Sequence, residues 1–375
     1  MNKKTKKENQ KTAVISDFPL SQLYFYLTEG CNLACRHCWL APKFDPDGSK
    51  SSMLPLGIFQ KAIEEAIPLG LQTVKLTGGE PLLHPDFNAM LDFISKKGLG
   101  LTLETNGILL SPKIAGAIAK QNNPFVSVSL DGADAKTHDR IRGVDGAFNK
   151  AISAVQSQVE YGTKTQIIMS IMQSNADQLE AMIELAESLD ADSVKFNIIQ
   201  PTGRGETFFD GVKGLEVEKL IELGRWVETE LAMQTDMELY FDHPAAFRSL
   251  RRIASGDGCS SCGILSILGV LPGGEYALCG IGSHVKELVF GKAGNGLLAK
   301  IWHEHSVLNR LRTGLPDKLT GICGHCLMKH ICLGSCIAQN YYRNKSLWAP
   351  FWFCEQAGAE GLFPESRLDL SFNNS

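Results

Sequence analysis

The sequence predicts an α/β fold, a partial (β/α)6 TIM-like barrel followed by a smaller, loop-rich domain that contains most of the cysteines. Three observations lead to this prediction. Strand-like and helix-like segments alternate over residues 20–235, which indicates a parallel sheet covered by helices. After about Met237 the periodicity weakens, and glycine, cysteine and aromatic residues accumulate. The length of 375 residues suits a barrel with an appended domain.

Six short apolar segments are expected to form the barrel strands, and helical spacing of apolar residues follows them. The segments are Leu23–Thr28, Thr73–Thr77, Leu101–Glu104, Phe125–Leu130, Thr165–Met172 and Ser193–Ile199. Ser111 and Pro112 form a helix start signal after the third strand. The last barrel helix is expected near Glu216–Ala232, and "LGVLPGGEYALC" predicts a hairpin turning at Gly273 and Gly274.

These segments divide the chain into a disordered basic tail (1–19), the barrel (20–235), a linker (236–257) and a C-terminal domain (258–375). The net charge of -4 gives no reason to expect a nucleic-acid partner. No signal-peptide pattern and no run of 18 or more apolar residues is present in the sequence. We therefore expect a cytoplasmic protein that binds neither nucleic acid nor membrane.

The chain has eleven cysteines, and they cluster near its two ends. Cys31, Cys35 and Cys38 (the triad) follow the first predicted strand with C-x3-C-x2-C spacing. The other eight are Cys259, Cys262, Cys279, Cys323, Cys326, Cys332, Cys336 and Cys354. In a reducing compartment this pattern favours metal ligation over disulfides. The triad lacks the fourth ligand of a closed zinc site, and His37 is cramped between two ligands. Thiolates alone suit zinc and iron–sulfur clusters equally.

Motifs at the strand ends separate these alternatives. Gly78, Gly79 and Glu80 follow the second strand, and His37 occupies the aromatic position of a C-x3-C-x-aromatic-C motif. Together these motifs resemble the radical S-adenosylmethionine (SAM) superfamily. The resemblance implies a [4Fe–4S] cluster on the triad, whose open iron binds SAM while the Gly-Gly-Glu motif holds the SAM amino group. It also implies SAM contacts from Ser129 and from an arginine downstream, Arg140 or Arg142.

The C-terminal cysteines resemble those of the SPASM domain, in the run from Cys323 to Cys336 followed by Cys354, and in Gly274-x4-Cys279. That resemblance implies two auxiliary [4Fe–4S] clusters, and therefore three clusters in all. The first would use Cys259, Cys262, Cys279 and Cys336. The second would use Cys323, Cys326, Cys332 and Cys354. Two zinc sites built from the same eight cysteines are the alternative.

The resemblance implies reductive cleavage of SAM to a 5′-deoxyadenosyl radical, which abstracts hydrogen from a peptide and leads to a crosslink or another modification. Expected partners are the peptide substrate, a separate leader-binding protein, and an electron donor such as flavodoxin or ferredoxin. Glu104, Asp131 and Asp242 are candidates for the catalytic base.

Three other functions are weighed against this one. An anaerobic sulfatase maturase is disfavoured because Gly280 stands where those enzymes carry an acidic residue. Tetrapyrrole side-chain modification stays open. A non-enzymatic electron-transfer protein would not need a cluster with an open iron.

Overall fold

The computed structural model describes residues 18–208, 214–254 and 262–369, and its centre is one ten-stranded sheet. Strands β1 and β4 to β9 run parallel to one another in sequence order across the sheet. They are β1 (Gln22–Tyr26), β4 (Thr73–Thr77), β5 (Gly100–Thr105), β6 (Asn122–Ser129), β7 (Lys164–Ile171), β8 (Ser193–Ile198) and β9 (Glu238–Phe241). This confirms the predicted α/β fold with a parallel sheet. The predicted tail, up to residue 17, lies outside the described residues, as does Cys259.

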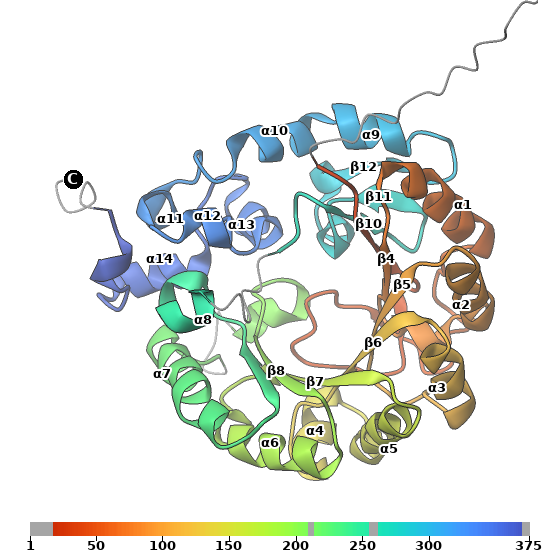
Figure 1. The fold of residues 1–375 in the computed structure, drawn as a ribbon, viewed down its shortest axis with the longest axis horizontal. Helices are drawn as coiled ribbons and strands as arrows, with labels where there is room; N and C mark the ends of the chain where they lie inside the picture. Colours follow the sequence, from red (N-terminus) through yellow and green to blue (C-terminus); the bar gives the residue numbers. More distant parts are fainter. Residues whose placement is uncertain (1–17, 209–213, 255–261, 370–375) are drawn as a thin grey trace, which may run out of the picture.

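The helices between these strands cover the outer face of the curved sheet (Figure 1). They are α1 (Leu56–Ala66), α2 (Phe87–Lys96), α3 (Pro112–Ala119), α4 (Ala135–Arg142), α5 (Ala147–Glu160), α6 (Leu179–Ser188) and α7 (Val217–Thr229). The short helix α8 (Leu250–Ala254) follows β9. The predicted start of α3 is confirmed, because the Ser111 hydroxyl accepts a hydrogen bond from the Ile114 N–H at 3.4 Å.

Side chains of the barrel strands alternate between an apolar outer layer and a polar inner one. The outward residues of four strands are buried against the helices: Val74, Leu76, Leu101, Leu103, Val126, Val128, Ile167 and Met169. Several residues between or just beyond them are polar and line a cavity inside the barrel: Thr77, Glu104, Ser129 and Ser170. The barrel interior therefore offers hydrogen-bonding groups at the carboxyl ends of its strands.

The predicted hairpin is confirmed as β10 (Ile267–Val270) and β11 (Glu275–Ala277), which pair antiparallel. It extends the barrel sheet, because β10 pairs in parallel with β1, and β12 (Val289–Lys292) pairs with β11. Short helices follow: α9 (Leu298–Glu304), α10 (Ser306–Gly314), α11 (Gly321–His325), α12 (Lys329–Cys332), α13 (Ile337–Asn344) and α14 (Trp352–Ala359). None of the helices in the three described ranges is both long and apolar enough to span a membrane.

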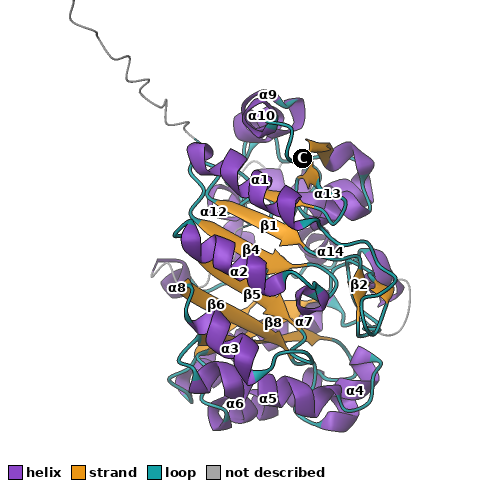
Figure 2. Ribbon diagram, turned by 90° about the vertical axis from the view of Figure 1, so that its right-hand side faces the viewer, coloured by secondary structure: helices purple, strands orange, loops and turns teal. Residues whose placement is uncertain are grey.

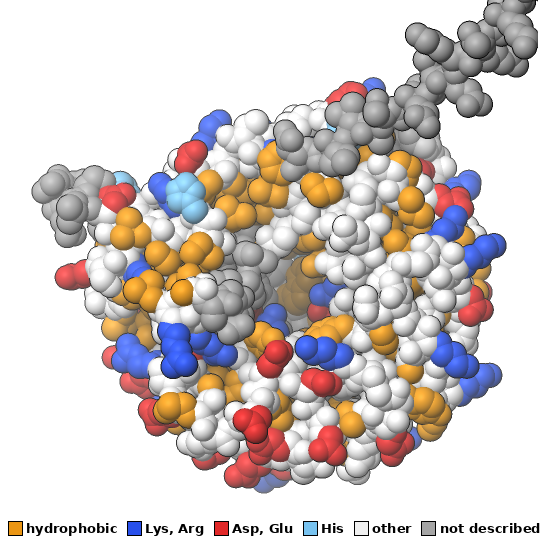
Figure 3. Space-filling model, viewed as in Figure 1, with side chains coloured by type: hydrophobic (Ala, Val, Ile, Leu, Met, Phe, Trp, Pro, Cys, Tyr) orange, Lys and Arg blue, Asp and Glu red, His pale blue; other side chains and the backbone are white. Residues whose placement is uncertain are grey.

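The triad loop begins with the two-residue strand β2 (Gly30–Cys31), which pairs with β3 (Lys43–Phe44). Figure 2 shows β2 beyond the carboxyl ends of the barrel strands, which run in one direction. Viewed as in Figure 1, the surface of the molecule is hollowed near its centre (Figure 3). The fold thus places the triad at the rim where functional groups of a parallel barrel gather.

Candidate active site

One cavity of about 380 Å³, here called the site cavity, is lined by residues from both ends of the chain. The triad and His37 lie on one side, and strand-end residues supply much of the remaining wall. Lining residues include Gly78, Gly79, Glu80, Glu104, Asn106, Ser129, Arg142, Lys195, Arg204, Asp242, Cys279 and Cys336. The fold therefore brings the triad, the Gly-Gly-Glu motif and two C-terminal cysteines to one place.

The two glycines of the Gly-Gly-Glu motif let the second strand end pack directly on the triad loop. Gly78 has a φ of 133°, in the region that favours glycine. A Cβ on Gly79 would collide with the carbonyl oxygen of Gly30. That same oxygen accepts a hydrogen bond from the Glu80 N–H at 2.9 Å. In the structure these glycines allow a close approach to the cysteine loop itself, one residue before Cys31.

Glu80 ties the ends of two neighbouring strands together below the triad. Its carboxylate accepts hydrogen bonds from the hydroxyl of Thr105 at 2.6 Å and the N–H of Asn106 at 2.9 Å. The N–H of Leu82 donates a third at 3.2 Å. Burial raises the pKa of Glu80 to about 7, although these three donors favour the charged form. Glu80 lines the cavity, and its carboxylate also holds the ends of β4 and β5 together through these hydrogen bonds.

Asn106 belongs to the site although the sequence analysis did not select it. Its side-chain amide donates to Asn32 Oδ1 at 2.7 Å and lies 3.8 Å from Cys31 Sγ. Its backbone N–H donates to Glu80. The polar segment "ETNG" (Glu104–Gly107), at the end of the third predicted strand, is the sequence feature that could have identified it. Asn106 thus links the Gly-Gly-Glu turn to the first cysteine of the triad.

A buried charge network supports the second cysteine. Asp131 is fully buried, and its Oδ2 lies 2.7 Å from Arg142 Nε and 3.4 Å from His37 Nε2. Arg142 Nη1 reaches Cys35 Sγ at 3.6 Å. Burial alone would raise the pKa of Asp131, but Arg142 and His37 hold that pKa below its ordinary value. Burial lowers the pKa of His37 to about 4, so at neutral pH its ring is uncharged.

The loop "QPTGRG" after β8 fastens the other side of the triad loop. The Arg204 guanidinium donates to the carbonyl oxygens of Cys35 at 2.7 Å and Pro42 at 3.0 Å. Its backbone N–H donates to the Cys38 carbonyl oxygen at 3.1 Å. Gly203 has a φ of 60° and lies against the Trp39 backbone. Arg204 is a second site residue that the sequence analysis did not single out.

The other predicted site residues divide into two groups. Ser129, Arg142, Glu104 and Asp242 line the site cavity. Glu104 also forms an ion pair with Lys75 and accepts a hydrogen bond from Thr77 at 3.2 Å. Asp131 and Arg140 are not among the lining residues. Asp131 is held in the network behind the triad, and Arg140 is exposed, donating to the Ser174 carbonyl oxygen at 3.3 Å.

The described C-terminal cysteines lie in two groups, and Cys259, the fourth member predicted for the first, lies outside the described residues. Cys262, Cys279 and Cys336 form the first set. Burial raises the pKa of Cys262, and the neighbouring thiols of Cys336 and Cys279 raise it further. Cys336 joins this set although it lies only four positions after Cys332 in the sequence.

The second set contains Cys323, Cys326, Cys332 and Cys354. The thiols of Cys323 and Cys354 interact directly, and the charges of Cys332 and Cys326 also act on Cys354. The N–H groups of Phe351 and Met328 donate to Cys323 Sγ at 3.4 Å and Cys326 Sγ at 3.3 Å. Backbone donors aimed at sulfur suit thiolates that ligate a metal centre.

The donor set of the triad fits an iron–sulfur cluster with one open position. It supplies three thiols, and the site cavity lies directly beside them. Asn106 and Arg142 aim N–H groups at two of the sulfurs, which favours the thiolate form. Over the described ranges, no three His, Cys, Asp or Glu side chains are placed to hold a single metal ion.

Comparison with protein families identifies the barrel. Residues 25–186 match the model of the radical SAM superfamily. This part of the chain is a radical SAM domain. The family implies a [4Fe–4S] cluster and SAM, and the C-terminal part of the chain fits a SPASM domain.

Curated relatives and a solved structure resemble this chain along most of its length. The AdoMet-dependent heme synthase of Methanosarcina barkeri is 28% identical over 340 residues, covering 84% of this chain and 90% of the relative. The mycofactocin maturase MftC of Mycobacterium tuberculosis is 27% identical over 347 residues, covering 92% and 85%. Streptococcus suis SuiB, solved with its precursor peptide SuiA, superposes with a TM-score of 0.70 at 18% identity, covering 92% and 78%. That superposition shows the fold.

Proposed function

We propose that this radical SAM enzyme modifies a peptide, installing a crosslink or a comparable change during maturation of a ribosomally made precursor. One observation carries the proposal: the site cavity is lined by the triad and also by Cys279 and Cys336 of the first C-terminal set. A substrate in this cavity would lie between the triad and a second thiol-rich centre. The similarity to MftC supports a peptide as substrate.

The proposal includes three [4Fe–4S] clusters, one on the triad and one on each C-terminal set. Cys31, Cys35 and Cys38 would hold the triad cluster, which with SAM would supply the radical that abstracts hydrogen from the substrate. The chain's own residues prepare this chemistry. Asn106 and Arg142 stabilise the triad sulfurs, Glu80 and Arg204 fix the surrounding loops, and the buried strand ends restrict water.

Proton transfer and partners complete the proposal. Glu104 and Asp242 line the cavity and are the candidates to accept a substrate proton. An electron donor such as flavodoxin or ferredoxin would reduce the triad cluster, and a separate protein would bind a peptide leader. We place the enzyme in the cytoplasm, because a reducing compartment keeps its thiols available for iron.

Anaerobic reconstitution tests the proposal. The protein should bind about twelve irons and form 5′-deoxyadenosine from SAM under reductant. The variant C31A/C35A/C38A should keep about eight irons and form none. A short peptide encoded beside the gene should increase 5′-deoxyadenosine formation. Mass spectrometry should show that this peptide has lost hydrogen. Zinc in place of iron, or no SAM cleavage, would overturn the assignment.

Tetrapyrrole modification is the second candidate, and the similarity to an AdoMet-dependent heme synthase favours it. The same assay separates the two, since a tetrapyrrole would then stimulate 5′-deoxyadenosine formation and the peptide would not. Sulfatase maturation has less support. A side chain at Gly280 would lie 2.5 Å from the Tyr26 ring and 2.7 Å from the Trp39 ring, leaving no room for an acidic residue.

A further inference from the structure

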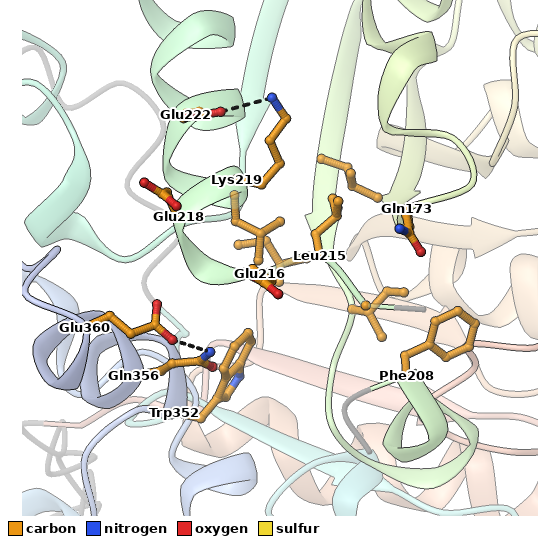
Figure 4. Close-up of a pocket in the computed structure, with 15 residues that line it drawn as sticks. Gln173, Phe208, Leu215, Glu216, Glu218, Lys219, Glu222, Trp352, Gln356 and Glu360 are labelled. Carbon is orange, nitrogen blue, oxygen red and sulfur yellow. Dashed lines mark hydrogen bonds and ion pairs between the residues drawn. The ribbon is translucent and has the colours of Figure 1, made fainter. Parts of the chain in front are cut away.

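A second pocket of about 620 Å³ lies between the barrel and the C-terminal helices. Its residues come from the ends of β7 and β8, from the first turns of α7 and from α14. Figure 4 shows Trp352 of α14 facing the start of α7, with Phe208 on the far side. Trp352, Phe208 and Leu220 are buried and give the pocket apolar walls.

This pocket adjoins the site cavity. Ile198 and Ile199, at the end of β8, line both spaces. Each is only 6% exposed, and the two spaces meet at these residues. A chain lying in the outer pocket would therefore be positioned to extend toward the triad and the first C-terminal set.

The rim of the pocket is acidic. Its described lining residues include four glutamates, Glu216, Glu218, Glu222 and Glu360, and one lysine, Lys219. Lys219 extends away from Trp352 and pairs with Glu222 at 3.0 Å (Figure 4). The carboxylates of Glu216, Glu218 and Glu360 also lie at the rim, at the ends of α7 and α14. Glu360 accepts a hydrogen bond from the Gln356 side-chain amide at 2.9 Å (Figure 4).

The helix ends account for part of this charge. Glu216 and Glu218 lie at the start of α7, where a carboxylate suits the helix dipole, yet Glu216 makes no capping hydrogen bond. Glu360 lies at the C-terminal end of α14, where the helix dipole disfavours a carboxylate. A cationic group in the pocket would offset this unfavourable position.

We propose that this pocket binds a lysine- or arginine-containing stretch of the peptide substrate and directs the neighbouring residues into the site cavity. The apolar walls suit the methylene stems of such side chains, and the glutamate rim suits their charged ends. This inference rests on the proposed function, because it names the chemistry of that function's substrate.

Fluorescence anisotropy on the reconstituted enzyme with SAM tests the inference. The probes are two fluorescein-labelled decapeptides, one alternating glycine with lysine and the other glycine with glutamate. Wild type should prefer the lysine probe, and the preference should weaken as salt rises. The variant E216Q/E218Q/E360Q should bind the lysine probe about tenfold more weakly.

The control variant E180Q/E184Q/E187Q also loses three negative charges, but from the exposed face of α6, so it should bind the lysine probe as wild type does. Wild type without a lysine preference, or an equal loss in both variants, would overturn the inference. SAM cleavage distinguishes this failure from a failure of the proposed function. If 5′-deoxyadenosine still forms but wild type shows no preference for the lysine probe, only the pocket assignment is refuted. If the lysine probe binds as expected but no peptide is modified, only the proposed function is refuted.

Discussion

Gly79 shows how a single missing side chain positions the triad loop. A Cβ at this position would meet the backbone carbonyl of Gly30, and neither backbone can move without displacing Cys31. We expect Gly79→Ala to destabilise the fold by about 1–3 kcal/mol. It should also lower the iron content by about four per chain, since only the triad cluster is disturbed. Gly57→Ala is the matched control, because a Cβ there meets nothing within 4 Å. Equal iron contents in the two variants would refute this role of Gly79.

Arg142 neutralises a carboxylate that has no access to water. Asp131 is 0% exposed, so Arg142→Ala would leave a buried charge with only a neutral His37 and backbone donors beside it. We expect a loss of about 3–5 kcal/mol in the free energy of unfolding, measured by denaturant titration. 5′-Deoxyadenosine formation should fall as well. Arg140→Ala removes an exposed guanidinium from the same helix and should change stability by less than about 0.5 kcal/mol. Similar losses from both variants would contradict the assignment.

The sequence identified the residues of contiguous motifs but could not choose between Arg140 and Arg142. Two residues apart on a helix, at about 100° per residue, their side chains point to nearly opposite sides. Which of them faces the triad depends on how α4 docks, and that is decided by distant packing. Asn106 was missed for a related reason: its partners Asn32 and Cys31 lie more than 70 positions away in sequence.

At the scale of elements, the six predicted strands are confirmed to within a few residues at each end, and β4 matches its prediction at both ends. Strand β9 was missed, because its four residues are too few to establish a period. The parallel pairing of β10 with β1 was also unforeseen. It joins residues about 245 positions apart, and nothing local in either strand specifies that partner.

One contact between elements makes stability depend on pH. His243 follows β9 and lies 3.0 Å from Glu228 of α7, with both side chains buried. Burial lowers the pKa of His243, and the Glu228 pKa is also low because His243 and the nearby arginines outweigh the effect of burial. Both groups have a lower pKa in the folded state than in the unfolded state. Each therefore adds to the free energy of unfolding at pH values above its unfolded pKa, and this contribution is lost as the pH falls toward the folded pKa.

The melting temperature should therefore fall as the pH is lowered from about 7 to about 5. His243→Gln should show a smaller fall over the same range, whereas replacement of the exposed His303 by Gln should leave it unchanged. Circular dichroism at a series of pH values measures both. A fall of equal size in His243→Gln and wild type would mean that another group controls the acid sensitivity.

Across the whole molecule, the sequence predicted which cysteines group together but not how the groups hold the C-terminal helices. Helices α11 and α12 contain five and four residues, too short to be stable alone. Ring contacts of Phe247 with Phe353 and Phe363, at 5.1 and 5.4 Å, join the segment around α14 to the barrel side. The second cysteine set would supply the remaining constraint when it binds metal.

Hydrogen exchange should therefore separate two parts of the chain. In the variant C323A/C326A, amides of α11 to α14 should exchange about ten times faster or more than in wild type, because their short helices would lose the proposed metal that connects them. Strands β4 to β8 should keep their protection, since their core is buried independently of that set. The variant C31A/C35A/C38A removes thiols at the other end of the molecule and should leave α11 to α14 unchanged. Uniform loss of protection in C323A/C326A would mean that the chain unfolds as one unit and that the metal holds the whole molecule together.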